Sequence, residues 1–375
     1  MIYLDHAATT PVPKAVADAM YTVLTEQYAN PNAQYPFGQE MRRSVEDWRA
    51  VIAKAVDCEA NQLFFTSCGT EGDNWAIRAA CWQNRHVGRH IVTTAVEHHA
   101  VLNCCQQLEQ EGWEVTRLLP DANGDISAEA VLSAVRPDTA LVSVMMVNNE
   151  LGSIYPIADI AKGLKAVNEK TLLHTDAVQG FLKVPFSAKA LGADFIAISG
   201  HKIGAPKGIG ALYVKKGLRL PPLTFGGGQE RGMRPGTEAV PNIAAFAKAC
   251  EIRMAHFDED YAHVQELADY LKQQVSAELP DAAINGEGDI PHVVNLSMPG
   301  CKSEVMLHVL EGDEVYISSG SACSKGKQSG VLKALGLPKT RTDSALRVSF
   351  APFNTREDVD AFVAAVKKGA KMFRR

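Results

Sequence analysis

Residues 194–202 read Asp-Phe-Ile-Ala-Ile-Ser-Gly-His-Lys, a short apolar run that ends in a lysine. A run of this length and composition is typical of a strand that is buried on both faces of a sheet. Lys202 then lies at the carboxyl end of the strand, where a buried ammonium is costly unless its pKa falls or it reacts. A lysine that forms a Schiff base with an aldehyde cofactor meets this condition. The alternative is a lysine whose amine reaches water past the strand end.

Similar apolar runs recur along the first two thirds of the chain. They occupy residues 62–67, 90–95, 140–147, 172–177 and 210–214. The segments 37–56, 99–112 and 157–167 lie between such runs or before the first of them, and their apolar residues show helical spacing. Strands that alternate with helices predict a mainly parallel sheet that is covered by helices on both faces.

The pattern of the sequence changes near residue 240. A helical stretch over residues 241–279 is followed by shorter strand and helix patterns, at residues 292–297, 303–310, 315–318, 345–350 and 355–372. This mixture predicts a smaller α+β domain. We therefore expect three parts: an N-terminal segment that packs with the smaller domain (residues 1–15), a large domain (16–250) and a small C-terminal domain (251–375).

The composition argues against several classes of protein. Of 375 residues, 46% are apolar and 22% are charged, which is ordinary for a globular chain. The formal net charge of −5 provides no overall basic field, so we expect no direct nucleic-acid partner. No apolar stretch approaches the length of a membrane span, and the first residues do not resemble a secretory signal. The eight cysteines include no Cys-x-x-Cys pair, so we expect no metal site, reduced thiols and a cytoplasmic location.

A second polar residue, Asp176, lies at the end of the apolar run at residues 172–177. In an open α/β sheet, ligands bind at the carboxyl ends of the strands, where Asp176 and Lys202 would both fall. A pyridoxal ring accepts electrons well only if its nitrogen stays protonated, and a buried aspartate beside that nitrogen holds the proton there. The pair therefore indicates pyridoxal 5'-phosphate as the cofactor. Taken alone, Asp176 is equally well explained as a helix N-cap.

Residues 66–71, Thr-Ser-Cys-Gly-Thr-Glu, stand where one apolar run ends and a helix is expected to begin. Small residues let the backbone approach a ligand, and the start of a helix offers unpaired N–H groups. The segment is therefore a candidate phosphate cradle. Its spacing matches neither of the standard nucleotide fingerprints, and an ordinary capped turn is the alternative.

Residues 318–330 consist mostly of serine, glycine and lysine around one cysteine, Cys323. The absence of apolar periodicity predicts a solvent-facing loop. Lys325 and Lys327 favour the thiolate form of Cys323, which is the nucleophilic form. Cys323 is either a reactive nucleophile or an incidental exposed thiol.

Six short motifs extend over nearly the whole chain. They are residues 3–10 (YLDHAATT), 147–150 (VNNE), 199–202 (SGHK), 226–237 (GGGQERGMRPGT), 318–323 (SSGSAC) and 347–349 (RVS). In this order they resemble the cysteine desulfurases of the NifS-like group, within the fold-type I, class V aminotransferase-like pyridoxal phosphate enzymes. The resemblance implies an α/β large domain with a mainly parallel seven-stranded sheet, and a smaller α+β domain that carries the catalytic cysteine loop.

The resemblance also implies roles for single residues. Lys202 resembles the lysine that forms the Schiff base and moves the α-proton of the substrate, and Cys323 resembles the nucleophile that takes the sulfur. Asp176 resembles the partner of the pyridine nitrogen. His98 resembles the histidine that lies against the ring and assists proton transfer. Arg347 resembles the clamp on the substrate carboxylate, for which the planar fork of a guanidinium is suited.

The remaining matches surround the cofactor in the family. Asn149 and Gln179 resemble groups near the phenolic oxygen of the cofactor and the substrate. The phosphate cradle is implied at Gly69, Thr70, Ser199 and His201. Thr237 resembles a residue that contacts the phosphate of the neighbouring subunit, which implies a homodimer with active sites shared across the interface.

The function implied by the resemblance is conversion of L-cysteine to L-alanine, with the sulfur held on Cys323 as a persulfide and passed to an acceptor protein. That acceptor is an iron–sulfur scaffold or an enzyme of thio-cofactor or transfer-RNA thiolation. A class V aminotransferase or a selenocysteine lyase is the alternative, and an aminotransferase has no need of Cys323. A non-enzymatic sulfur-relay scaffold is the third reading. Cys68 stands beside the expected phosphate site where many members have small or hydroxyl residues. The loop after Cys323 is short and the chain ends soon after its last helix, which leaves the acceptor open.

Overall fold

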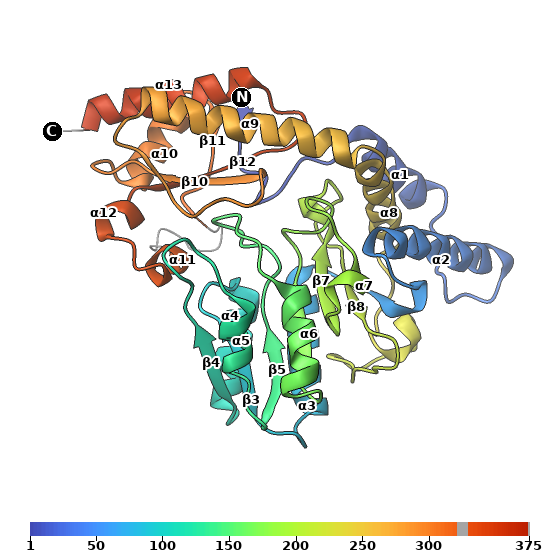
Figure 1. The fold of residues 1–375 in the computed structure, drawn as a ribbon. Coiled ribbons are helices and arrows are strands. Elements are labelled where there is room, and N and C mark those ends of the chain that lie inside the picture. The colour runs from blue at the N-terminus through green and yellow to red at the C-terminus, as the bar shows by residue number, and fades with distance from the viewer. Residues whose placement is uncertain (321–328, 374–375) are drawn as a thin grey trace.

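The computed structural model describes residues 1–320 and 329–373 (Figure 1). Its central feature is a sheet of seven strands in the order β2-β8-β7-β6-β5-β3-β4. The strands are β2 (Leu63–Thr66), β3 (His90–Thr94), β4 (Glu114–Leu118), β5 (Thr139–Ser143), β6 (Leu172–Asp176), β7 (Phe195–Ser199) and β8 (Gly210–Val214). Neighbouring strands are parallel except where β8 pairs with β2 and with β7. The mainly parallel seven-stranded sheet expected from the sequence is confirmed.

Six of the strands coincide with apolar runs of the sequence, and β4 does not. β4 is an edge strand whose residues are all exposed or half-buried, so its sequence EVTRL lacks the apolar run of a central strand. The run at residues 140–147 extends beyond β5, because residues 144–147 leave the sheet and remain buried near the carboxyl edge.

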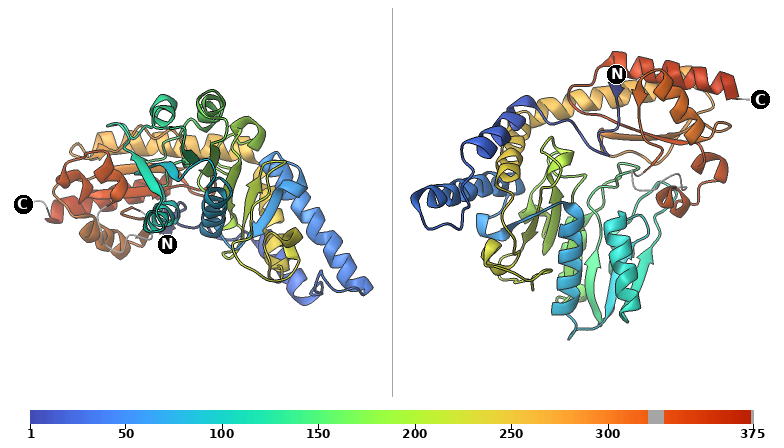
Figure 2. Two further views of the ribbon diagram at one scale, coloured as in Figure 1. Left: turned by 90° about the horizontal axis from the view of Figure 1, so that it is seen from below. Right: turned by 180° about the vertical axis from the view of Figure 1, so that it is seen from behind.

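Helices cover both faces of the sheet, as the alternating pattern predicts (Figure 2). On one face α3 (Gly69–Gln83) and α4 (His99–Gln110) pack on inward-facing strand residues such as Ile91 and Leu141. The next residues along the same strands, Val92 and Val142, point to the other face and pack in the core that includes α6 (Ile157–Val167). Successive strand residues point to opposite faces, so runs that are apolar throughout give a sheet with two buried faces.

Four further helices precede α8 (Val240–Ala255). They are α1 (Lys14–Thr25), α2 (Pro36–Val56), α5 (Ala128–Ser133) and α7 (Ala188–Leu191). α1 and α2 both pack against α8. The expected single helix over residues 241–279 is wrong: the chain forms α8 and then α9 (Phe257–Glu278), with a break at His256. Three acidic residues in the first turn of α9 favour a new helix N-terminus at this point.

A second hydrophobic core lies at one end of the large sheet (Figure 2). It holds the antiparallel strands β9 (Ala283–Ile284), β10 (Val293–Ser297) and β12 (Ala345–Ser349), and the helices α9, α10 (Ser303–Gly312) and α13 (Arg356–Phe373). The N-terminal strand β1 (Ile2–Tyr3) pairs with β11 (Val315–Tyr316), and Leu4 is fully buried in this core. Two short helices, α11 (Gly330–Ala334) and α12 (Lys339–Thr342), precede β12. The domain boundary near residue 250 stays a prediction.

Among the described residues, no helix combines the length and the apolar character needed to span a membrane.

Candidate active site

A cavity of about 240 Å³ opens at the carboxyl ends of the central strands. Both ends of the chain contribute to it, because Ala7 and Ala8 line it together with Arg347 of β12. Ten of the residues predicted from the sequence line this cavity: Gly69, Thr70, His98, Asn149, Asp176, Gln179, Ser199, His201, Lys202 and Arg347. The structure therefore brings together residues that lie almost 280 positions apart in the sequence.

Lys202 lies in a 3₁₀ turn, Gly200–Lys202, that follows β7 directly. Its Nζ donates hydrogen bonds to the carbonyl oxygens of Ala7 at 2.5 Å and Ala8 at 2.8 Å. The amine is therefore inside the cavity rather than in solvent, so the alternative of a lysine that reaches water past the strand end is wrong.

Asp176 is the last residue of β6 and is only 5% exposed. One carboxylate oxygen accepts the N–H of Val178 at 2.9 Å, which is the local capping contact that the sequence also allowed. Burial raises the pKa of Asp176, while His98, the Val178 N–H and Lys202 act to lower it. An ionised Asp176 therefore gains from any further positive charge that enters the cavity.

His98 caps a helix and also lines the cavity. It is the N-cap of α4, and its Nδ1 accepts the N–H of Ala100 at 3.2 Å. Nδ1 is thus unprotonated, and the ring proton is on Nε2. Burial lowers the pKa of His98, so the ring is neutral at physiological pH. His99, the less favoured candidate in the sequence, does not line the cavity.

Arg347 is almost fully buried and is held by two contacts from opposite ends of the chain. Its Nη1 donates to the Asn149 carbonyl at 3.0 Å, and its Nη2 donates to Asp5 at 2.8 Å. The Nε of Arg347 is buried without a hydrogen-bond partner among the described residues. Arg347 lines the cavity, and a guanidinium with an unpaired N–H is a suitable binding group for a carboxylate.

Two predicted residues remain, Thr237 and Cys323. Thr237 is on the surface of the single chain and does not line the cavity, so its contact with a neighbouring subunit stays a prediction. Cys323 lies outside the described residues. The described residues that flank it are close to the site: Ser318 pairs with Arg347 through its backbone, and Ser329 Oγ donates to Glu150 at 2.5 Å.

The cavity also contains a carboxyl group that the sequence analysis missed. Asp73 lines the cavity, is 1% exposed and lies 3.3 Å from His174, whose Nδ1 is 2.9 Å from Ser143 Oγ. Burial and the nearby Asp176 raise the pKa of Asp73 well above its ordinary value. The spacing of four residues from Gly69 is the signal that would have found it, because residues i and i+4 share a helix face.

Glu97, next to His98, provides a prediction on stability. Its Oε1 accepts hydrogen bonds from Thr94 Oγ1 and from the Met145 N–H, both at 2.9 Å, and burial raises its pKa to about 8. The unfolded chain ionises this group near pH 4.3, so the folded protein loses stability as the pH rises from there to 8. We expect Glu97→Gln to remove that loss, which amounts to at most about 1.4 kcal/mol for each pH unit.

The measurement is the free energy of urea unfolding of wild type and Glu97→Gln between pH 5 and 8. The difference between the two proteins should grow with pH in favour of the variant. Glu40→Gln, at an exposed position of α2, is the matched control and should run parallel to wild type. Parallel curves for Glu97→Gln as well would show that Glu97 is ionised in the folded protein.

Known proteins place the chain in a family. It matches the family described as Aminotransferase class-V over residues 2–362. A cysteine desulfurase from Nostoc sp. is 41% identical over 367 residues, which cover 97% of this chain and 91% of the relative. The chain belongs to the cysteine desulfurase family. Cysteine desulfurase IscS from Methanosarcina thermophila is 40% identical over 369 residues, with 97% of this chain and 91% of the relative covered.

Solved structures of the family share the fold. A NifS-like protein superposes with a TM-score of 0.93 at 34% identity, covering 99% of each chain. SspA in complex with cysteine superposes with a TM-score of 0.84 at 32% identity, covering 95% of this chain and 100% of the other. The fold-type I architecture expected from the sequence is thereby confirmed.

The family depends on pyridoxal phosphate, and the residues of the cavity fit that cofactor. Ser199 Oγ is buried at the cavity without a hydrogen-bond partner among the described residues, so it is available to a phosphate oxygen. A Cβ added at Gly69 would lie 2.6 Å from Val178 Cγ2, so only glycine leaves this edge of the cradle open. No side chain caps the start of α3, so its first N–H groups suit the phosphate, and the buried Asp176 suits the ring nitrogen.

Proposed function

We propose that this chain converts L-cysteine to L-alanine and takes the substrate sulfur onto Cys323 as a persulfide. The observation that carries the proposal is the convergence of Lys202, Asp176 and Arg347 on one cavity. Ser318 pairs with Arg347 through its backbone and precedes Cys323 by five residues. This supports delivery of the thiol to the same place.

In this proposal each residue of the cavity has one task. Pyridoxal phosphate, when bound, supplies an electron sink for the bond that breaks at the substrate α-carbon. Lys202 would hold the cofactor through a Schiff base, and its amine would take the α-proton of cysteine and return a proton to the product. Asp176 would keep the ring nitrogen protonated, and Arg347 would hold the substrate carboxylate. His98 would lie against the ring and Gln179 beside its phenolic oxygen.

The transfer of sulfur involves two thiols, that of Cys323 and that of the substrate. The Cys323 thiolate attacks the substrate sulfur, so a sulfur–sulfur bond forms as the carbon–sulfur bond of the substrate breaks. The electron pair of that bond passes to the substrate β-carbon, which takes a proton and leaves as the methyl group of alanine. Cys323 is left as a persulfide, ready to pass its outer sulfur to an acceptor thiol.

Three further features belong to the same proposal. Thr237 contacts the phosphate of a neighbouring subunit, so the working enzyme is a homodimer with shared sites. The sulfur acceptor is an iron–sulfur scaffold or a thiolation enzyme. The enzyme acts in the cytoplasm.

The test is a single turnover of the holoenzyme with L-cysteine and no added thiol. We expect about one alanine and one protein-bound persulfide for each active site, with the persulfide on the peptide that contains Cys323. Alanine without persulfide would contradict the role of Cys323. Amino-group transfer from cysteine to a keto acid in place of alanine formation would assign the chain as an aminotransferase.

Arg347 gives a prediction on substrate binding. We expect Arg347→Lys to lower kcat/KM for L-cysteine by about 100-fold, because a charge-assisted hydrogen bond contributes about 1.5–3 kcal/mol and lysine lacks the fork. Cysteamine, which has the thiol and the amine of cysteine but no carboxylate, is the matched control. Its binding, measured as the change in cofactor absorbance, should be equal in wild type and variant. If Arg347→Lys weakens the binding of cysteamine as strongly as it lowers kcat/KM for cysteine, Arg347 does not act through the substrate carboxylate.

A further inference from the structure

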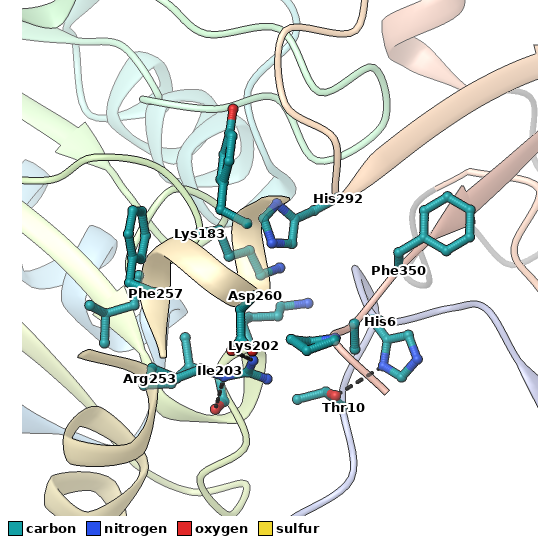
Figure 3. A pocket seen from close by; sticks show the side chains of 14 residues that line it. His6, Thr10, Lys183, Lys202, Ile203, Arg253, Phe257, Asp260, His292 and Phe350 are labelled. Carbon is teal, nitrogen blue, oxygen red and sulfur yellow. Dashed lines mark hydrogen bonds and ion pairs between the residues drawn. The ribbon is translucent and has the colours of Figure 1, made fainter. Parts of the chain in front are cut away.

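A second lysine, Lys183, lies behind the catalytic one. Lys183 and Lys202 both line a small pocket of about 20 Å³, which adjoins the active-site cavity because Lys202 borders both (Figure 3). Lys183 is only 7% exposed, and neither the sequence analysis nor the proposed chemistry gives it a task.

Placing Lys183 at this position has two costs. Burial lowers its pKa well below the ordinary value, and the neighbouring cations Lys202, Arg253 and Arg347 act in the same direction. The residue before it, Leu182, has a φ of 52°, a left-handed conformation that costs a branched side chain about 1–2 kcal/mol. A buried amine held by a strained turn beside a reactive centre points to a role in that centre.

The charged and titratable groups around Lys183 do not neutralise it. The pocket carries one carboxylate, Asp260, and this accepts a hydrogen bond from Arg253 at 3.0 Å. Burial lowers the pKa of His6 to about 4 and that of His292 well below its ordinary value, so both rings are neutral. Electrostatic attraction therefore does not explain the position of Lys183. Its hydrogen bond is the contact that remains.

A chain of hydrogen bonds leads from Lys183 to Lys202. Lys183 Nζ donates to Gln179 Oε1 at 3.0 Å, and Gln179 Nε2 donates to the Ala7 carbonyl at 2.9 Å. The same carbonyl oxygen accepts Lys202 Nζ. The two ends of a glutamine amide have nearly the same shape, so only their partners decide which way the amide faces. An amine that donates on one side and a carbonyl that only accepts on the other both select the same orientation.

We propose that Lys183 is a positioning residue that keeps the NH₂ group of Gln179 turned to the cavity, where it donates to the phenolic oxygen of the cofactor. This inference rests on the proposed role of Gln179 beside that oxygen. Without Lys183, Gln179 Oε1 loses the donor that the structure gives it, and only the Ala7 carbonyl still selects this orientation, so the turned amide, with its oxygen towards the cavity, becomes more populated. An acceptor that faces the phenolic oxygen withdraws a hydrogen bond from it and adds repulsion.

The test is a pH titration of the visible absorbance of the holoenzyme. A donor to the phenolic oxygen favours its ionised form and lowers the pKa of the link between the cofactor and Lys202. Lys183→Met, which keeps the length of the side chain and removes the donor, should raise that pKa by about one unit. Lys183→Arg keeps a donor and should stay close to wild type. Lys183→Gln is too short to reach Gln179 and replaces the methionine variant if that variant does not fold.

Gln179→Ala separates a positioning role from a structural one. We expect this variant to raise the same pKa, and Lys183→Met added to it to cause no further shift. A full further shift in the double variant would overturn the inference, because Lys183 would then act without Gln179. If Gln179→Ala shifts the pKa and Lys183→Met alone does not, the inference fails while the assignment of Gln179 stands. No shift with Gln179→Ala refutes that assignment and the inference with it.

Discussion

Replacing Lys202 by alanine is expected to lower alanine release by at least about 1,000-fold. General acid–base catalysis by a positioned side chain contributes about 100- to 10,000-fold, and this variant also loses the covalent link to the cofactor. The fold should survive, because the substitution removes hydrogen bonds to the Ala7 and Ala8 carbonyls and leaves the strands of the sheet unchanged. The measurement is alanine formed from L-cysteine by the cofactor-saturated protein.

Borohydride reduction gives an independent readout of the same variant. In wild type it should fix the cofactor irreversibly to the peptide that contains Lys202, and in Lys202→Ala it should fix none. Lys207→Ala, at an exposed position five residues along the chain, is the control and should behave as wild type. Retention of covalent cofactor in Lys202→Ala would move the Schiff base to another lysine, and Lys183 would be the first to examine.

Replacing Cys323 by alanine is expected to abolish persulfide formation and to lower steady-state alanine release by at least about 100-fold, since loss of a catalytic nucleophile removes a whole step. The residues that bind cofactor and substrate do not include Cys323. L-cysteine should therefore still change the visible absorbance of the variant. The measurement pairs persulfide analysis with an absorbance titration.

Cys68 is the matched control for Cys323, since it is the cysteine that lines the cavity among the described residues. We expect Cys68→Ser to keep both alanine release and the persulfide. A persulfide that persists in Cys323→Ala and disappears in Cys68→Ser would assign the sulfur to Cys68 and contradict the proposed function.

The sequence predicts buried strands better than half-buried ones. Strands such as β6 and β7 are buried on both faces, so burial alone dictates an apolar run that a reader can recognise. β4 has one free edge and half-buried residues, and no such constraint acts on it. The break at His256 is not predicted, because helical spacing continues across it. The turn depends instead on which tertiary surfaces α8 and α9 cover.

The residues of the candidate site also fall into two groups, those that the sequence alone reveals and those that need the fold. Lys202 and Asp176 stand out from the residues alone, since a charged group at the end of a buried strand requires a reason. Arg347 reads as an ordinary strand residue until the fold brings it against Asp5, and only the resemblance identified it beforehand. Lys183 was missed because its significance comes from burial beside other charged groups, which sequence spacing does not reveal. Asp73 was missed because the helix face that it shares with Gly69 was not followed one turn further.

The contact between Asp5 and Arg347 has a consequence for how the protein is made. The two residues are 342 positions apart, and the Ala7 N–H, which binds Ser349, spans a similar distance. At about 5–20 residues per second, a ribosome needs roughly 20–70 seconds to travel from one to the other. During that interval the N-terminal residues have no partner strand, and Lys202 is made well before Arg347. Activity therefore cannot begin before Arg347 has been made, and a fragment that stops earlier contains the sheet but lacks a complete active site.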